Sequence, residues 1–370
     1  MCAIYTLDKQ PILLYTKGVR IAISLQKKRR FFMKEVRVAI IGFGGIARSH
    51  YSGYKLLERE NAPVRVVAVC DIDLSKFNSQ VKINIEADNE TLEKNIRTYT
   101  DVDEMLSKED FDMADICLPS YLHKEFTVKL LNAGKHVMCE KPMALSSSDC
   151  DEMIDAANAS GKKLMIGQCL RFNAVYSYLK DAVTDGRFGK LVHLYMYRRS
   201  GQPRWGFENW FTGTERSGGC ILDMHIHDID MARYLLGDPY AVSCISYDTV
   251  ARWAVENSRL YYNGVMVVAD GSWNESDTAK FQSGFIARFE NAEVICDASG
   301  LKVYPDRGDV FIPELPKTNH MAEEIRFFAS TILDPDIKNE KNPPKSARET
   351  VRLIEKLRES AEKNGVIIKL

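Results

Sequence analysis

Three polar residues in this sequence have the side-chain types of a proton-transfer site: Lys141, Asp223 and His227. Asp223 and His227 are four residues apart, so in a continuous helix they would lie on one face, about one turn from each other. A carboxylate beside an imidazole can fix the tautomer of the ring and stabilise its charged form, as a general base requires. Lys141 could polarise a substrate oxygen or share its proton. Taken singly, each residue is more often a solvated loop residue, a helix cap or a surface pair, so the catalytic interpretation depends on the elements around them.

The first of these elements is a strand that leads directly into a glycine-rich turn. The branched apolar run Val36–Ile41 is typical of a strand buried on both faces. Gly42 would let the chain turn, Gly44 would let a backbone approach a pyrophosphate, and Ala47 is small enough for a helix to pack against the strand. The unpaired N–H groups at the start of that helix would face the phosphates.

A second apolar run, Val64–Cys70, ends at Asp71, whose carboxylate could accept hydrogen bonds from both ribose hydroxyls of NAD. Asp71 lies 27 residues beyond Gly44, which is more than the usual spacing of about 20, and the polar connection at residues 57–63 could hold the surplus. The same carboxylate would repel the 2′-phosphate of NADP. The sequence therefore predicts a dinucleotide site that prefers NAD to NADP.

The segments after Asp71 alternate between strand-like and helix-like patterns. Strands are expected at 114–118, 135–139 and 163–169, and a helix at 146–160, with serines and Asp149 available to cap its start. Such alternation predicts a doubly wound parallel sheet, whose ligand lies beyond the carboxyl ends of its strands. Gly42, Asp71, Pro119 and Lys141 all fall at such ends.

The pattern of alternating strands and helices ends at Arg171. After Pro239, strand-like runs follow one another without helices between them. Such runs predict an open, mainly antiparallel sheet. We expect a Rossmann domain at 33–170, an α/β substrate and oligomerisation domain at 171–330, and a closing helix and strand at 331–370. Residues 1–32, with the basic cluster at 27–30, do not fit a secretory signal. We expect them to be a dispensable, poorly ordered leader, with Met33 as an alternative start of translation.

The bulk composition excludes several classes of protein. The formal net charge of −1 gives no general attraction to nucleic acid or to an anionic membrane, and no apolar run approaches the ~20 residues of a membrane span. The 9 cysteines include no CxxC pair or metal-like spacing. This usage is typical of reduced, buried thiols in a cytoplasmic protein.

Two further groups of residues leave alternatives open. His225 and His227 suggest a metal site, but in a helix they would point about 200° apart, so no metal is predicted unless the segment is extended. Arg198, Arg199 and Arg204 lie in a polar and aromatic segment at 195–211. They could bind an anionic substrate, although a solvated loop or a subunit contact is at least as common.

Together these residues resemble the glucose-fructose oxidoreductase and inositol dehydrogenase (Gfo/Idh/MocA) family, from about Met33 to Leu370. The resemblance rests on the glycine turn followed by His50, on the Pro119 to His123 element, on Glu140-Lys141-Pro142 and on residues 218–230, with residues 346–370 similar to the last helix and strand of the family. Two departures matter. Ser120 stands where the family often has Asn, and His225 replaces a common Gly, which would make the floor of the pocket bulkier or add a donor to it.

The resemblance implies a Rossmann domain followed by an α/β domain whose open sheet commonly forms an oligomer interface. It implies that Lys141, Asp223 and His227 are catalytic, with the nicotinamide near Lys141. The residues it assigns to cofactor binding are Gly42, Phe43, Gly44, Gly45, Ile46, Ala47, Asp71, Pro119, Ser120, His123, Glu140 and Lys141.

We therefore expect a cytoplasmic, homo-oligomeric dehydrogenase, a dimer or a tetramer, that transfers a hydride between NAD and a secondary alcohol of a sugar, inositol or related polyol. His227 would take the hydroxyl proton, oriented by Asp223, while Lys141 stabilises the developing alkoxide. Alternatives are a relative acting on a dihydrodiol or on an acidic or amino sugar derivative, and a non-catalytic NAD-binding regulator. No nucleic acid, membrane or metal partner is expected.

Overall fold

The computed structural model describes residues 15–16, 19–20, 35–77 and 91–370, and the chain divides into two units at residue 33. In the first unit, β1 (Tyr15–Thr16) pairs antiparallel with β2 (Val19–Arg20). Most of the expected leader, residues 1–32, lies outside the described residues. All that follows concerns the second unit.

The first sheet of the second unit has six parallel strands in the order β5-β4-β3-β6-β7-β8. Its strands are β3 (Val36–Ile41), β4 (Val64–Cys70), β5 (Arg97–Tyr99), β6 (Met113–Ile116), β7 (His136–Glu140) and β8 (Leu164–Gly167). The strand order reverses at β3, and in doubly wound sheets ligands bind at the carboxyl ends of the strands at such a switch point. The predicted parallel sheet is confirmed.

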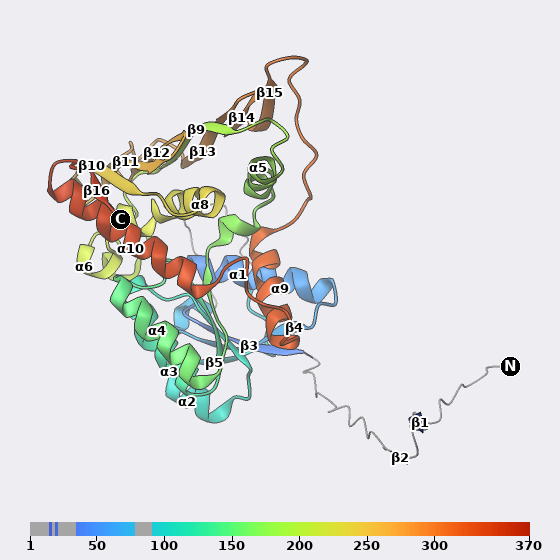
Figure 1. The fold of residues 1–370 in the computed structure, drawn as a ribbon. Helices are drawn as coiled ribbons and strands as arrows, with labels where there is room; N and C mark the ends of the chain where they lie inside the picture. The colour runs from blue at the N-terminus through green and yellow to red at the C-terminus, as the bar shows by residue number, and fades with distance from the viewer. Residues whose placement is uncertain (1–14, 17–18, 21–34, 78–90) are drawn as a thin grey trace. The chain divides into compact units, whose positions relative to one another are not determined.

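Helices cover both faces of this sheet (Figure 1). On one face lie α2 (Val102–Lys108), α3 (His123–Asn132) and α4 (Ser147–Ser160), and on the other lies α1 (Gly45–Arg59). Alternate residues of β3 pack into the hydrophobic cores on the two faces of the sheet. Val38 and Ile40 pack with α1, and Ala39 and Ile41 pack with α2 and α3. The expected helix at 146–160 is α4, and Ser146 caps it by accepting a hydrogen bond from the Asp149 N–H.

The expected domain boundary at residue 330 falls inside α9 (His320–Leu333), which packs against α1 rather than on the second sheet. Ile325 and Phe328 share a buried cluster with Ile40 of β3. Gly53 makes the approach possible, because a Cβ there would lie 3.2 Å from Ala322 N and from Ile325 Cδ1. The chain thus returns to the first sheet after it has completed most of the second.

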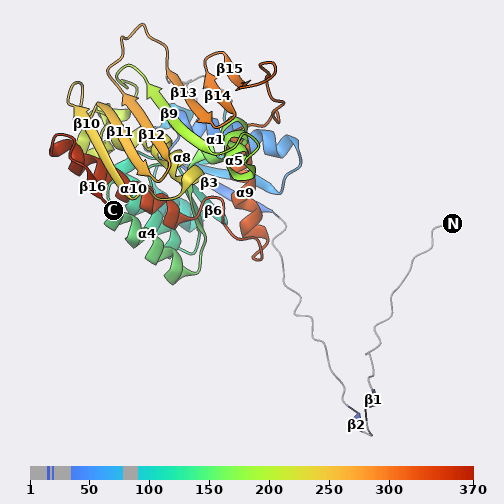
Figure 2. The ribbon, with the colours of Figure 1, turned by 45° about the horizontal axis from the view of Figure 1, so that its top comes forward.

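The second sheet has eight strands in the order β15-β14-β13-β9-β12-β11-β10-β16, which Figure 2 shows side by side for β13, β9, β12, β11 and β10. The strands are β9 (Leu191–Arg199), β10 (Ala241–Tyr247), β11 (Val255–Tyr262), β12 (Val265–Ser272), β13 (Gln282–Phe289), β14 (Ala292–Asp297), β15 (Gly300–Pro305) and β16 (Ile368–Lys369). Only the β9–β12 pairing among these described strands is parallel. The mainly antiparallel sheet is confirmed.

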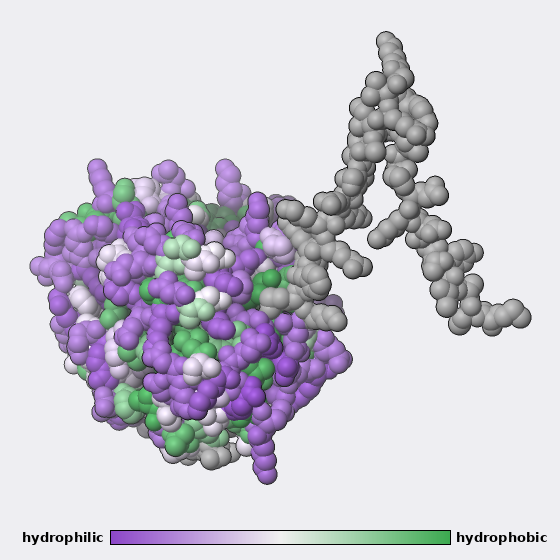
Figure 3. All heavy atoms as spheres, turned by 90° about the horizontal axis from the view of Figure 1, so that it is seen from below, coloured by the Kyte–Doolittle hydropathy of each residue, from purple (hydrophilic) through white to green (hydrophobic). Residues whose placement is uncertain are grey.

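One face of the second sheet is covered by α5 (Ala174–Asp185), α8 (Ile226–Leu236) and α10 (Pro344–Glu362). The opposite face carries no helix of the described chain and exposes large apolar side chains, among them Ile245, Tyr247 and Met266. No helix within the described residues is long and apolar enough to cross a membrane. The face in Figure 3, seen from below the view of Figure 1, is mostly hydrophilic with small separate hydrophobic groups.

Candidate active site

The glycine turn after β3 has the geometry that a bound pyrophosphate requires. Gly42 has φ +86, and a Cβ on it would lie 2.6 Å from the Cys117 carbonyl oxygen, so only glycine fits. A Cβ on Gly44 would meet no described heavy atom within 4 Å, which leaves open space above the turn. No side chain caps α1 at Gly44, so the first N–H groups of the helix are available to an anion.

Asp71, at the end of β4, is 6 % exposed and already holds several donors. Its Oδ2 accepts a hydrogen bond from the Phe43 N–H at 2.7 Å, and its Oδ1 accepts one from the Asp73 N–H at 2.9 Å. Lys76 Nζ lies 3.0 and 3.1 Å from the two oxygens. A ribose would therefore share this carboxylate with Lys76. The repulsion of a 2′-phosphate is weaker than Asp71 alone would give, because the ammonium partly neutralises the carboxylate.

The Pro119 to His123 element joins β6 to α3, and it begins with the short helix η2 (Ser120–Leu122). His123 is buried, with Nδ1 2.7 Å from the Pro142 carbonyl oxygen and Nε2 2.8 Å from that of Leu118. Burial lowers the pKa of His123. The ring thus ties the turn after Lys141 to the end of β6, and both of its nitrogens face backbone carbonyls.

The structure brings Lys141 and Asp223 together, although 82 residues separate them in the sequence. Lys141 Nζ donates a hydrogen bond to the Asp223 backbone carbonyl at 2.7 Å and lies 3.5 Å from its Oδ1. Their side chains are 15 % and 14 % exposed, so the pair is neither a solvated surface contact nor sealed in the core. An ammonium held in this way is partly accessible and can donate a hydrogen bond to a substrate oxygen.

Asp223 and His227 do not lie in one continuous helix, which was the condition for the two side chains to share a face. Asp223 ends α7 (Cys220–Asp223), and His227 is the second residue of α8. Between them the His225 N–H donates to the Cys220 carbonyl five residues back, a π-type turn that alters the angle between the two side chains. Among the described residues, His227 Nδ1 has no hydrogen-bond partner. Asp223 therefore contacts Lys141 and makes no described hydrogen bond to the His227 ring.

His227 lies in an electropositive, densely packed environment. Although part of the residue is accessible, burial among its neighbours, together with the charges of Lys141, Arg198 and His320, holds the pKa of His227 well below its usual range. The ring is therefore neutral at physiological pH and can accept a proton.

His225 points into the second sheet. It is fully buried, its Nε2 lies 2.9 Å from Ser258 Oγ on β11, and its Cβ would be 3.0 Å from a Cβ on Gly271 of β12. Burial and the charge of Arg198 lower the pKa of His225 to about 3. Its ring therefore packs on the strands as a neutral group.

The three arginines considered as anion ligands are all paired with carboxylates. Arg198 is buried and lies 3.1 Å from Asp228, while Arg199 and Arg204 pair with Glu275 and Asp277 on the surface. The anion-binding alternative gains no support from these contacts. The aromatic part of the same segment, by contrast, reaches the first domain, since the Phe207 ring lies 5.7 Å from Lys76 Nζ. Beyond the segment, the Arg216 guanidinium lies 5.3 Å from the centre of the Tyr121 ring.

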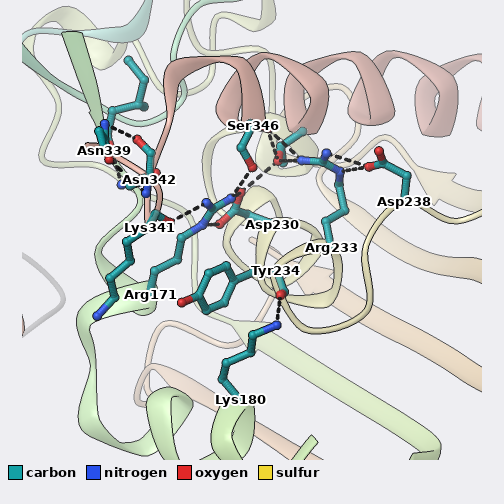
Figure 4. A network of polar contacts seen from close by, with 12 residues as sticks. Arg171, Lys180, Asp230, Arg233, Tyr234, Asp238, Asn339, Lys341, Asn342 and Ser346 are labelled. Atoms are coloured by element: carbon teal, nitrogen blue, oxygen red, sulfur yellow. Dashed lines mark hydrogen bonds and ion pairs between the residues drawn. The ribbon is translucent and has the colours of Figure 1, made fainter. Parts of the chain in front are cut away.

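A buried network that the sequence reasoning missed holds α8 in place (Figure 4). Arg171, in the short helix η3 (Cys169–Phe172), donates to Asp230 of α8 from Nε at 2.8 Å and from Nη2 at 2.6 Å. Thr350 of α10 also donates to Asp230, at 2.9 Å. Because α8 carries His227, this network fixes the candidate base relative to η3 and α10. No spacing rule links Arg171 to Asp230, so only the fold reveals the pair.

A cavity of about 540 Å³ lies elsewhere, between α5, α9 and the segment before α9. Its lining includes Phe172, Asp181, Glu323 and Lys341, and none of the three candidate catalytic residues. The cavity therefore adjoins η3 and Lys341 but not the proton-transfer groups. The candidate site is thus assigned from the convergence of side chains at the ends of the strands, in agreement with the position of ligands in doubly wound folds.

Two models of one protein family match the chain in succession. Residues 36–168 match the model described as "Oxidoreductase family, NAD-binding Rossmann fold", and residues 176–298 match "GFO/IDH/MocA C-terminal domain". The first match contains the glycine turn, Asp71 and Lys141, and the second contains Asp223 and His227.

Among curated proteins, the chain is 33 % identical over 207 residues to 2,7-anhydro-N-acetylneuraminate hydratase of Mediterraneibacter gnavus, covering 55 % of this chain and 50 % of that protein. It is 35 % identical over 209 residues to D-glucoside 3-dehydrogenase of Escherichia coli, covering 55 % of each. The chain thus spans about half the length of these curated relatives. Among solved structures, the aldose-aldose oxidoreductase of Caulobacter crescentus, complexed with glycerol, has a TM-score of 0.76 at 21 % identity, covering 91 % of this chain and 100 % of that one. This likeness shows a common fold.

Proposed function

Because this chain belongs to the Gfo/Idh/MocA oxidoreductase family, we propose that it is an NAD-dependent dehydrogenase acting on a secondary alcohol of a sugar, inositol or related polyol. The observation that carries the proposal is the hydrogen bond of Lys141, just beyond the carboxyl end of β7, to Asp223, at the end of the short helix that precedes α8 and His227. The D-glucoside 3-dehydrogenase relative supports the substrate class.

The residues of the first domain fit NAD. Gly42 and the uncapped start of α1 suit the pyrophosphate, and Asp71 suits a ribose. The remaining residues proposed for the cofactor site are Phe43, Gly44, Gly45, Ile46, Ala47, Pro119, Ser120, His123, Glu140 and Lys141. When bound, NAD supplies the hydride acceptor, and the protein contributes position and proton transfer.

Each of the three catalytic residues has a distinct task in this proposal. The neutral ring of His227 accepts the proton of the substrate hydroxyl, because its pKa leaves it unprotonated. Lys141 Nζ donates a hydrogen bond to the same oxygen and stabilises the negative charge that develops there. Asp223 holds Lys141 through its backbone carbonyl and its carboxylate, so its role is to orient the ammonium rather than the imidazole.

We propose that the enzyme is a cytoplasmic homo-oligomer, a dimer or a tetramer. The apolar side chains on the open face of the second sheet support a subunit contact there, since a large exposed apolar surface marks an interaction site. All cysteines in the described part of the chain are free thiols, which supports a reducing compartment.

A substrate panel tests the function. Purified protein is mixed with NAD or NADP and with aldoses, glucosides, inositols, and an acidic and an amino sugar, and NADH or NADPH fluorescence is followed. We expect reduction with NAD and at least one neutral sugar or inositol. Reduction only with an acidic or amino sugar would favour the alternative substrate class, which the 2,7-anhydro-N-acetylneuraminate hydratase relative suggests. Tight NADH binding with no reduction, together with a partner protein retained on pull-down, would favour a regulator.

A further inference from the structure

A buried chain of polar side chains runs beneath Lys141 and ends at its backbone. His50, on α1, lies between two carboxylates, with Nδ1 2.9 Å from Asp115 Oδ2 and Nε2 2.8 Å from Glu140 Oε1. Glu140 Oε2 in turn accepts a hydrogen bond from the Lys141 N–H at 3.2 Å. His50 and Asp115 are fully buried and Glu140 is nearly so. Three elements, α1, β6 and β7, thus supply one continuous line of contacts.

Both ends of this line are held by further contacts. Tyr54 donates a hydrogen bond to Asp115 Oδ2 at 2.9 Å, one helical turn beyond His50 on α1. At the other end, β8 packs directly on the Glu140 carboxylate, since a Cβ on Gly167 would lie 2.7 Å from Glu140 Oε1. The carboxylate therefore has little freedom to leave the Lys141 N–H.

Both contacts of the His50 ring can be hydrogen bonds to carboxylates only when His50 is protonated. Burial disfavours the imidazolium, but the Asp115 carboxylate outweighs it and the pKa of His50 is raised well above its usual range. An imidazolium donates from both nitrogens and so serves both carboxylates, whereas a neutral ring would leave one of them without a donor. The titratable groups that face His50 from the elements around it are Tyr54, Asp115, Cys117, Glu140, His320 and Glu324.

A metal site is the competing explanation, because His50, Asp115 and Cys117 have potential ligand atoms within 4.8 Å of one another. The His50–Asp115 contact is, however, a hydrogen bond of 2.9 Å. Both ring nitrogens of His50 are already engaged, Nδ1 by Asp115 and Nε2 by Glu140, so neither is left for an ion in this arrangement. The cluster fits a hydrogen-bonded line better than a chelate.

We propose that Asp115, His50 and Glu140 are positioning residues that aim Lys141 at the reacting oxygen, so that their loss lowers turnover. The peptide between Glu140 and Lys141 sets the direction in which the lysine leaves β7, and the Glu140 carboxylate folds back to hold that peptide. The proposal rests on the proposed function of Lys141.

Asp115→Asn and Glu140→Gln test the proposal, because each preserves the shape of the side chain and removes its charge. We expect each to lower kcat at least about tenfold, as misplacement of a catalytic group does. Asp115 is not among the proposed cofactor residues, so Asp115→Asn should also keep the Kd for NADH within about threefold of wild type. In Asp115→Asn, His50 loses the charge that keeps it protonated, so kcat should also fall as the pH rises through the lowered pKa of His50. A merely structural role would not create this pH dependence.

Asp112→Asn is the matched control, since Asp112 pairs with Arg37 just before the same strand, β6, away from Lys141. It should lose stability without changing the pH profile of kcat. Lys141→Ala, measured in parallel, separates the two claims. A Lys141→Ala variant with normal turnover would overturn the proposed function, whereas a large loss there with unchanged Asp115→Asn and Glu140→Gln would overturn only the positioning line.

NMR of histidine-labelled protein supplies a readout that needs no substrate. The His50 ring, assigned by its loss in His50→Gln, should stay protonated on both nitrogens through neutral pH in the wild type and should become neutral there in Asp115→Asn. A neutral His50 in the wild type at pH 7 would overturn the proposal, whatever the kinetics show.

Discussion

At the scale of single residues, the account depends on His227 being neutral before substrate binds. Its pKa lies well below the usual range because burial and the Lys141, Arg198 and His320 charges oppose the imidazolium. Raising the pH through a pKa deprotonates a ring, so the basic, active form is already complete at neutral pH. The sequence identified the residue, but its electrostatics come from Arg198 and His320, which no local pattern associates with it.

This neutrality predicts the pH dependence of alcohol oxidation. Between about pH 8 and about pH 6, His227 should contribute no fall in kcat/KM, and the decline due to its protonation should begin only well below 6.5. The measurement is the pH profile of kcat/KM for the wild type and for His227→Gln. A decline centred near the ordinary histidine pKa in the wild type, and absent from His227→Gln, would contradict the assigned state of the ring.

Gly42 and Gly44 give a second prediction at this scale. Gly42→Ala should unfold at lower urea concentration, with a loss of more than about 1 kcal/mol, because its φ is +86 and its Cβ would clash with the Cys117 carbonyl. Gly44→Ala should cost less stability than Gly42→Ala, since its Cβ meets no described atom within 4 Å and only the N-cap preference of glycine over alanine is lost. It should nevertheless raise the Kd for NADH on the order of tenfold, because the methyl group fills the approach to the pyrophosphate. Unchanged NADH binding in Gly44→Ala would argue against a cofactor at this turn.

At the scale of elements, the strand, turn and helix around Gly42 were predictable because branched apolar residues and glycines act locally. The break between α7 and α8 was not, since Met224 and His225 are both compatible with a helix. The π-type bond from the His225 N–H to the Cys220 carbonyl, together with the seating of His225 on β11 and β12, depends on tertiary packing. Because of that break, Asp223 contacts Lys141 instead of the His227 ring that the sequence predicted as its partner.

The anchoring of α8 by Arg171 predicts a large effect from a small change. Asp230→Asn should destabilise the protein by about 3 kcal/mol, because it leaves a buried guanidinium without its charge partner. Turnover should fall by roughly tenfold as His227 moves with α8. Asp238→Asn is the control. The Asp238 side chain is exposed, and its nearly buried partner Arg233 keeps hydrogen bonds to Ser346 and Thr350, so the change should cost less than about 1 kcal/mol. Urea unfolding and kcat measure both, and equal effects of the two variants would contradict the anchoring role.

At the scale of the whole molecule, the parallel sheet was predictable because strands alternate with helices, and the antiparallel sheet because strands follow one another directly. The surface on which α9 packs was not predictable. The apolar stripe of α9 indicates only that one face is buried. That it packs on α1 depends on the close approach at Gly53, a feature visible only in three dimensions. The chain therefore closes the first domain with a segment that the sequence placed partly in the second.

The open face of the second sheet predicts the assembly. Tyr247→Glu and Met266→Glu should convert the proposed oligomer to monomers, because each places a charge on an apolar face while both side chains are exposed in the single chain. Ile337→Glu, on the connection between α9 and α10, is the control and should leave the mass unchanged. Light scattering after gel filtration measures the mass, and an unchanged oligomer in both sheet variants would place the subunit contact elsewhere.

The central claim is that Lys141 belongs to the reacting centre, and the turnover of Lys141→Ala tests it most directly. The assay uses whichever sugar or inositol the wild type oxidises, with NADH binding measured on the same sample and Lys124→Ala as a surface control. We predict a loss in kcat on the order of 10²-fold or more, with NADH binding largely kept. Near-normal turnover in folded Lys141→Ala would contradict the account.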